Sequence, residues 1–107
     1  MFLAKFSPTG SASFALAIGT DGVRVEALAI DTANNIVTTG ENGSLTFLGG
    51  VDGAFVAKFS STGSYRSGRI VASPSATANS IAVDRTHNNP VAAGSDYPFN
   101  YLLKLTP

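Results

Sequence analysis

The sequence lacks the residues from which many enzyme and metal sites are built: it has no cysteine, no tryptophan and one histidine. Without cysteine the chain has no disulfide, no thiolate metal ligand and no cysteine nucleophile. A single histidine is too few for a multi-histidine metal site. We therefore expect no resident metal, no cofactor and no catalytic residue.

Charge is scarce and balanced. Seven basic side chains offset seven acidic ones, so the formal net charge is zero. Binding to a phosphate backbone needs a basic surface, and we therefore expect no nucleic-acid partner. No apolar run approaches 18 residues, so we expect no membrane insertion. The first residues also lack the basic segment and long apolar core of a signal peptide.

Small and polar turn-forming residues are abundant. Glycine, serine, threonine and asparagine make up 40 of the 107 residues, whereas the chain has three lysines, two glutamates and no glutamine. Helices need long polar side chains on their solvent face, and β-turns need the small polar ones. The composition therefore predicts an all-β domain, and the 44% hydrophobic content argues against disorder.

The chain repeats itself. Phe2–Ser11 and Phe55–Ser64 are identical at eight of ten positions, at a spacing of 53 residues, and Leu28–Asp31 returns as Ile81–Asp84 at the same spacing. A diverged third copy of the first motif is Tyr101–Leu105. A period near 50 residues is typical of propeller blades and other stacked β arrays.

We therefore interpret residues 1–107 as one unit of tandem repeats, with repeat one at about residues 2–54 and repeat two at about 55–107. Alternation, turn residues and apolar runs predict strands at 2–6, 12–18, 25–31 and 36–39. The strand at 25–31 is mostly apolar, so we expect it to be buried on both faces. The Asn34–Asn35 pair suits a tight hairpin, because asparagine tolerates the left-handed region.

The motifs Ala54–Phe59, Thr62–Gly63, Ser80–Asp84, Asn88–Asn89 and Gly94 resemble the SBBP-type beta-propeller repeat family. The resemblance implies about two four-stranded antiparallel propeller blades. It also implies an extracellular or cell-envelope setting, and it implies no catalytic activity. In the family's terms, the innermost strand of a blade is formed by 25–31 and 79–84, and the second strand by 36–39 and 91–93. The third strand is formed by 2–6, 55–59 and 101–105, and the outermost strand by 12–18 and 64–71.

Nine strands make about two blades, and a closed propeller needs at least four. We therefore expect the chain to belong to a longer propeller or to complete a ring with copies of itself. A small two-layer sandwich is the alternative. In the ring, strand 12–18 of a neighbouring chain would supply the fourth strand of the last blade.

The repeated charged residues allow two interpretations. Asp31 and Asp84 end equivalent strands, and they are either carboxylates at a channel rim that bind a cation or substrate, or turn acids that accept backbone N–H groups. Their repetition favours the turn. Lys5, Lys58 and Lys104 repeat as well, which favours solvent-facing strand residues or edge guards over a catalytic lysine.

Other candidates are isolated. His87 is a general base or an exposed turn residue, and its lack of a Ser-His-Asp spacing favours the turn. The acid and glycine clusters resemble fragments of calcium loops without the regular alternation of oxygen ligands. The tyrosines and Phe99 form either an aromatic platform for a sugar or, as we favour, a core pair with two peripheral rings. The core pair is Phe99 and Tyr101, and the peripheral rings are Tyr65 and Tyr97.

The sequence therefore favours a non-enzymatic scaffold or protein-interaction module. Its candidate binding surface lies in the loops, where recognition residues concentrate. The residues of this surface are Asp21, Glu41, Asn42, Asp96 and Tyr97. The alternative is a carbohydrate- or calcium-binding lectin-like module. A hydrolase fragment is the weakest alternative, because the chain has no second histidine and no cysteine.

Overall fold

The computed structural model describes residues 1–17, 23–41, 52–71, 73 and 75–105. Within these ranges the chain forms nine β-strands and no helix, so no described helix could span a membrane. The strands are β1 (Phe2–Phe6), β2 (Ala12–Ala17), β3 (Arg24–Ile30), β4 (Ile36–Glu41), β5 (Ala54–Phe59), β6 (Tyr65–Val71), β7 (Thr77–Asp84), β8 (Asn89–Asp96) and β9 (Phe99–Lys104). The all-β prediction is confirmed.

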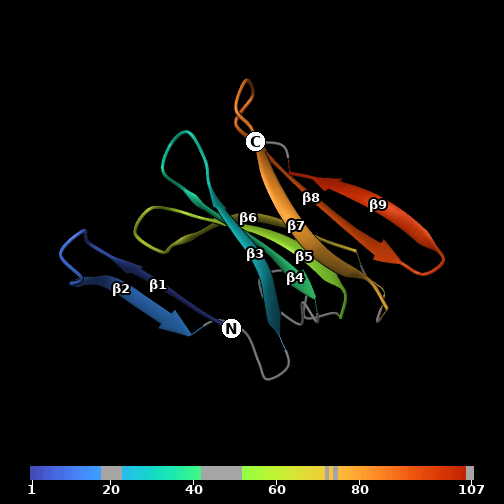
Figure 1. Ribbon diagram of the computed structural model, residues 1–107, viewed down its shortest axis with the longest axis horizontal. Coiled ribbons are helices and arrows are strands. Elements are labelled where there is room, and N and C mark those ends of the chain that lie inside the picture. Colours follow the sequence, from blue (N-terminus) through green and yellow to red (C-terminus); the bar gives the residue numbers. More distant parts are fainter. Residues whose placement is uncertain (18–22, 42–51, 72, 74, 106–107) are drawn as a thin grey trace.

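The strands form three antiparallel sheets, which lie next to one another in Figure 1. The first sheet has the order β1–β2, the middle sheet β3–β4–β5–β6, and the third sheet β7–β8–β9. Every strand predicted in the sequence is present within three residues of its expected ends, and only Ile18 of the strand predicted at 12–18 lies outside the described residues.

The turns repeat with the sequence. The Gly10 N–H donates to the Ser7 carbonyl at 2.9 Å, and the Gly63 N–H donates to the Ser60 carbonyl at 3.0 Å. Both glycines have positive φ, 88° and 95°, which side chains with a Cβ rarely adopt. The identical Thr-Gly-Ser segments therefore close the same hairpin turn in the first and middle sheets.

The β3–β4 and β7–β8 hairpins also share one geometry. Asn34 and Asn88 have positive φ, 64° and 56°, which confirms the tight turn expected at Asn34–Asn35. Both hairpins carry a register irregularity near their open ends, and a glycine of the partner strand faces it. A Cβ on Gly40 would lie 1.8 Å from the Arg24 carbonyl oxygen, and one on Gly94 would lie 1.8 Å from that of Thr77. Only glycine allows this backbone approach.

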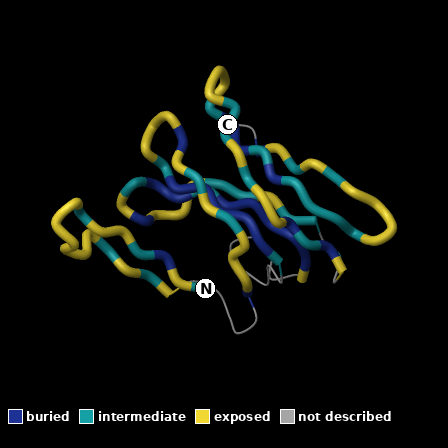
Figure 2. The backbone as a smooth tube through the Cα atoms, viewed as in Figure 1, coloured by how far each residue is buried: buried dark blue, intermediate teal, exposed yellow. Residues whose placement is uncertain are grey.

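The core lies between the sheets. Alternate residues of β5 face opposite neighbours, as strand geometry requires. Phe55 and Phe59 pack with Leu3 of the first sheet, whereas Val56 packs with Ala92 and the partly buried Leu103 of the third sheet. Figure 2 shows the buried segments concentrated in the middle sheet. One set of its apolar residues packs against the first sheet, and another set packs against the third.

One expectation about burial is wrong. Strand β3 was expected to be buried on both faces, yet Leu28 and Ile30 are exposed, and the strands with almost continuous burial are β4 and β5. The reason is position: β3 is an edge strand of its sheet, whereas β4 and β5 are paired on both sides. The apolar content of a strand shows how much apolar surface it can bury. The position of the strand in the sheet decides how much of that surface is buried.

Candidate functional site

A buried carboxylate marks the end of the middle sheet. The Oδ1 atom of Asp31 accepts the backbone N–H groups of Ala33 and Asn35, each at 2.8 Å. Its Oδ2 atom accepts the Asn35 side-chain amide at 2.9 Å and forms an ion pair with Lys58 Nζ at 2.8 Å. Burial would raise the pKa of Asp31, but the Lys58 ammonium and the hydrogen bonds from Asn35 and Ala33 outweigh it and hold that pKa well below its usual value.

The β7–β8 turn of the third sheet forms hydrogen bonds with Asp31 and its turn. Asn88 donates from its side-chain nitrogen to Asp31 Oδ2 at 3.2 Å, and its side-chain oxygen accepts the Thr32 N–H at 2.8 Å. One asparagine therefore satisfies a backbone donor and a carboxylate of the preceding hairpin, and it joins the middle and third sheets at their turns.

The equivalent centre of the third sheet is more open. Asp84 Oδ1 accepts the Thr86 N–H at 3.1 Å, while Oδ2 lies 2.9 Å from His87 Nδ1 and 3.7 Å from Lys104 Nζ. The hydrogen bond with His87 lowers the pKa of Asp84, and the smaller effect of burial opposes it. The turn interpretation of Asp31 and Asp84 is confirmed, because both carboxylates accept backbone N–H groups of their own hairpins.

The lysines differ from their expected role. Lys58 is largely buried and paired with Asp31, so the expectation of a solvent-facing side chain is wrong for it. Lys104 repeats the pairing over a longer distance, and Lys5 donates to the Ser61 carbonyl at 3.3 Å. The same repeat position is therefore exposed in β1 and β9, and it is largely buried beside a carboxylate only in β5.

A polar cleft of about 580 Å³ adjoins the Asp31 centre. Lys58 and Arg66 supply its cationic groups, and three serines supply hydroxyls. The remaining lining residues are Ala33 and Asn35. Lys58 is already neutralised by Asp31, whereas Arg66 has no ion pair with an acidic side chain among the described residues.

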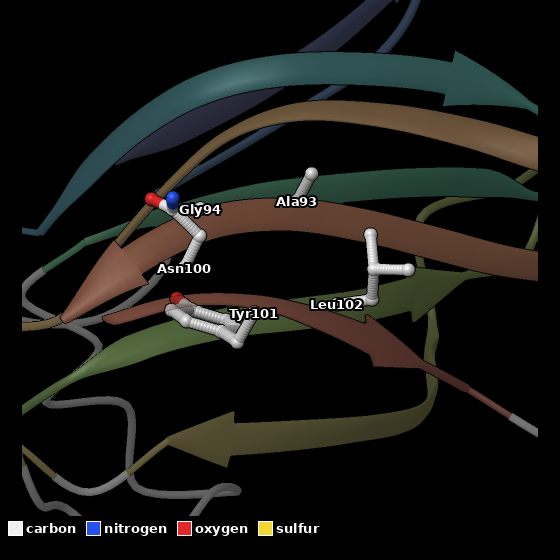
Figure 3. A pocket seen from close by; sticks show the side chains of 5 residues that line it. All are labelled: Ala93, Gly94, Asn100, Tyr101 and Leu102. Atoms are coloured by element: carbon white, nitrogen blue, oxygen red, sulfur yellow. The ribbon is translucent and has the colours of Figure 1, made fainter.

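A second hollow lies on the outer face of the third sheet. This groove of about 560 Å³ is lined by residues of β8 and β9, and Figure 3 shows them on these neighbouring strands. The lining residues are Ala93, Gly94, Asn100, Tyr101 and Leu102. The Tyr101 hydroxyl is occupied, since it donates to the Thr77 carbonyl at 2.6 Å. The groove is therefore mainly an apolar surface, and the side-chain amide of Asn100 forms no hydrogen bond with the part of the chain that the structure describes.

The five loop residues singled out in the sequence fall in different surroundings. Asp21 and Asn42 lie outside the described residues. Glu41 ends β4 and accepts a hydrogen bond from Arg24 at 2.7 Å. Asp96 ends β8 and accepts from the hydroxyls of Ser73 and Ser75, whereas Tyr97 is exposed in the turn before β9. Glu41 and Asp96 thus have separate partners.

The aromatic residues occupy different sheets. Tyr65 lies in the middle sheet, edge-to-face with Phe59 at 6.0 Å between ring centroids, and the other three lie in or beside the β8–β9 hairpin. Tyr101 packs against the cluster of Ala54, Ala76 and Ala78, as expected. Phe99 is exposed, so its expected place in the core is wrong. It lies beside the two-residue turn at the edge of the sheet, where no described strand covers it.

Within the described residues, no three histidine or acidic side chains gather in a group that could hold a metal ion. The sequence interpretation missed the inter-sheet contact of Asn88 and the groove beside Leu102. The repetition of asparagine at positions 34 and 88 was the available signal for the Asn88 contact. No local pattern indicates the groove, because a groove depends on which parts of a sheet are covered by other segments.

Comparison with known proteins gives no family assignment. No protein-family model matches the chain, and no curated protein matches its sequence.

Proposed function

We propose that the chain is a non-enzymatic β-propeller repeat module, which serves as a structural scaffold or protein-interaction domain in an extracellular or cell-envelope protein. In this proposal the three sheets are successive parts of blades. The first sheet supplies a third and fourth strand, the middle sheet a complete blade, and the third sheet a first to third strand.

The observation that carries the proposal is the recurrence of one ion pair. In the middle sheet Asp31, just after β3, pairs with Lys58 of β5, and in the third sheet Asp84 of β7 pairs with Lys104 of β9. Each pair links the region where the first strand of its sheet ends to the third strand. The same three-strand arrangement is therefore built twice from equivalent residues, as a repeat architecture requires.

The scaffold role rests on how these acidic residues are used. Both oxygens of Asp31 are engaged by its own turn, by Lys58 and by Asn88. A carboxylate held in this way stabilises the turn and the junction between two sheets. The resemblance to SBBP-type repeats supports the blade interpretation and the extracellular or cell-envelope setting.

A crystal structure tests the blade geometry. One rotation should carry β3–β5 onto β7–β9, and the same rotation about the same axis should carry β1–β2 onto β5–β6. Two unrelated rotations would overturn the proposal. The lectin-like alternative is tested on the same protein: a glycan array that shows binding, or a rise in melting temperature with calcium that EDTA reverses, would favour it.

A further inference from the structure

We infer that a second copy of this chain docks in the groove on the outer face of the third sheet, with Phe2 and Phe6 of its β1 strand against Leu102. The inference rests on the proposed function, because it extends the stacking of sheets within one chain to stacking between chains. It names the partner of the module and the two surfaces that meet.

The first surface is the outer face of the first sheet. Phe2 and Phe6 are 79% and 63% exposed, although their repeat equivalents Phe55 and Phe59 are 0% and 2% exposed. The two middle-sheet phenylalanines are buried because Leu3 of the preceding sheet packs on them. Among the described residues, no sheet covers the equivalent side chains on β1 in this way.

This face carries no charge. On this face of β1, Ala4 lies between the two phenylalanines. The residues of β2 that pair with Phe2 and Ala4 are Ala17 and Ala15, and the register is irregular at Phe6. Two exposed aromatic rings over small side chains make an apolar patch that water solvates poorly.

The second surface is the outer face of the third sheet. Leu102 is 75% exposed, although its repeat equivalent Val56 is fully buried. Val56 is buried because residues of the next sheet cover it, among them Leu103 and Leu105. The groove beside Leu102 is thus the surface that a following sheet covers elsewhere in the chain.

The internal interface identifies what fits that groove. The residues that cover the middle sheet at this place are Tyr101, Leu103 and Leu105. In the repeat alignment their equivalents on β1 are Phe2, Ala4 and Phe6. Strand β1, which carries the matching residues, is therefore exposed in the first sheet. The groove beside Leu102, which these residues match, is exposed in the third sheet.

The contact is head to tail, because the two surfaces differ. Each copy has one β1 face and one β9 face, so association yields a ring if the rotation closes and an open array if it does not. Single-face variants distinguish this arrangement from a symmetric dimer. Each variant blocks one face and leaves the other intact.

The variants are Leu102→Asp, which blocks the groove, and the double change Phe2→Asp with Phe6→Asp, which blocks the other face. We expect the unmodified chain to associate with rising concentration in light scattering after size exclusion. Each variant alone should be monomeric. An equimolar mixture should form a 1:1 dimer and nothing larger, because one free face remains on each partner. Leu28→Asp, on the exposed face of β3, is the matched control and should associate like the unmodified chain.

A second measurement does not depend on the aspartate variants. Because the sequence has no cysteine, Ala4→Cys and Leu102→Cys can be introduced singly and mixed under mild oxidation. Crosslinking between the two variants, above the level of either variant alone, is expected. An unmodified chain that stays monomeric at millimolar concentration, or a mixture of the aspartate variants that stays monomeric, would overturn the inference. The crystal structure tests the blade geometry separately. A monomeric result would therefore contradict this inference without contradicting the proposed function.

Discussion

The carboxylate of Asp31 and the ammonium of Lys58 lie 2.8 Å apart, at the turn where the middle sheet meets the third. The Asp31 side chain is fully buried and that of Lys58 is 18% exposed, whereas the equivalent Asp84 and Lys104 are 30% and 48% exposed and 3.7 Å apart. The two charges are therefore close together where a further sheet covers the pair, and farther apart where no described sheet covers it. Burial strengthens the attraction between the two charges and excludes competing water.

Replacing Asp31 by asparagine should destabilise the fold more than the same change at Asp84. Asp31→Asn places an amide donor against the buried Lys58 ammonium, and we expect a loss on the order of 2–3 kcal/mol. Asp84→Asn is the control at the exposed equivalent, and its effect should be smaller. Urea unfolding followed by circular dichroism measures both, and equal losses would show that burial does not govern the pair.

Acid should weaken the protein through Asp31. Its folded-state pKa lies below the unfolded value of about 4, so its contribution is complete above that value. The contribution is lost as the pH falls below about 4 towards the lowered folded-state pKa, by up to about 1.4 kcal/mol per pH unit for one carboxylate. Urea unfolding between pH 7 and pH 2 should therefore show a slope that Asp31→Asn reduces. Asn34→Gly, which leaves every carboxylate in place, should keep the slope of the unmodified chain.

Asn88 and Asn34 should respond differently to glycine, although both have positive φ. Glycine suits that backbone conformation, so Asn34→Gly should change the stability by only a few tenths of a kcal/mol. Asn88→Gly also removes the hydrogen bonds to Thr32 and Asp31 between sheets, which should cost about 1–2 kcal/mol. Thermal unfolding of the two variants checks this, and a neutral Asn88→Gly would mean that the inter-sheet bonds contribute nothing net.

The turns at Gly10 and Gly63 offer a similar comparison. Alanine at either position must adopt an unfavourable positive φ, at about 1–2 kcal/mol. At Gly63 the new methyl group would also lie 2.9 Å from Leu16 Cδ1 and 3.1 Å from Phe14, whereas nothing lies within 4 Å at Gly10. We expect Gly63→Ala to cost about 1 kcal/mol more, since the contacting side chains must shift. The difference between the two melting temperatures reports this packing of the first sheet on the middle one.

Much of the fold follows from local sequence patterns. The period of 53 residues, the alternation in β1 and β5, and the Thr-Gly-Ser turns predicted strands that the structure contains. The carboxylate of Asp31 was correctly interpreted as a turn acid, because its bonds to Ala33 and Asn35 span only two and four residues. Such features depend on neighbours in the chain, so a single sequence reveals them.

The partners across sheets did not follow from the sequence. The contact of Asn88 with Asp31 spans 57 residues, and nothing in either hairpin indicates which turn lies opposite. Likewise, Phe2 and Phe55 occupy the same place in their motifs, yet one is exposed and the other buried. The repeat assigns both to the same strand position and does not indicate which of the two is covered.

The sequence alone determined the strands, the turns and the equivalence of residues in the repeats, because φ preferences and side-chain alternation act over a few residues. Only the tertiary structure decided which equivalent face is covered, which lysine is buried with its carboxylate, and where the groove beside Leu102 lies. Those outcomes depend on the order in which sheets pack, and packing is set by surfaces that meet across long stretches of chain.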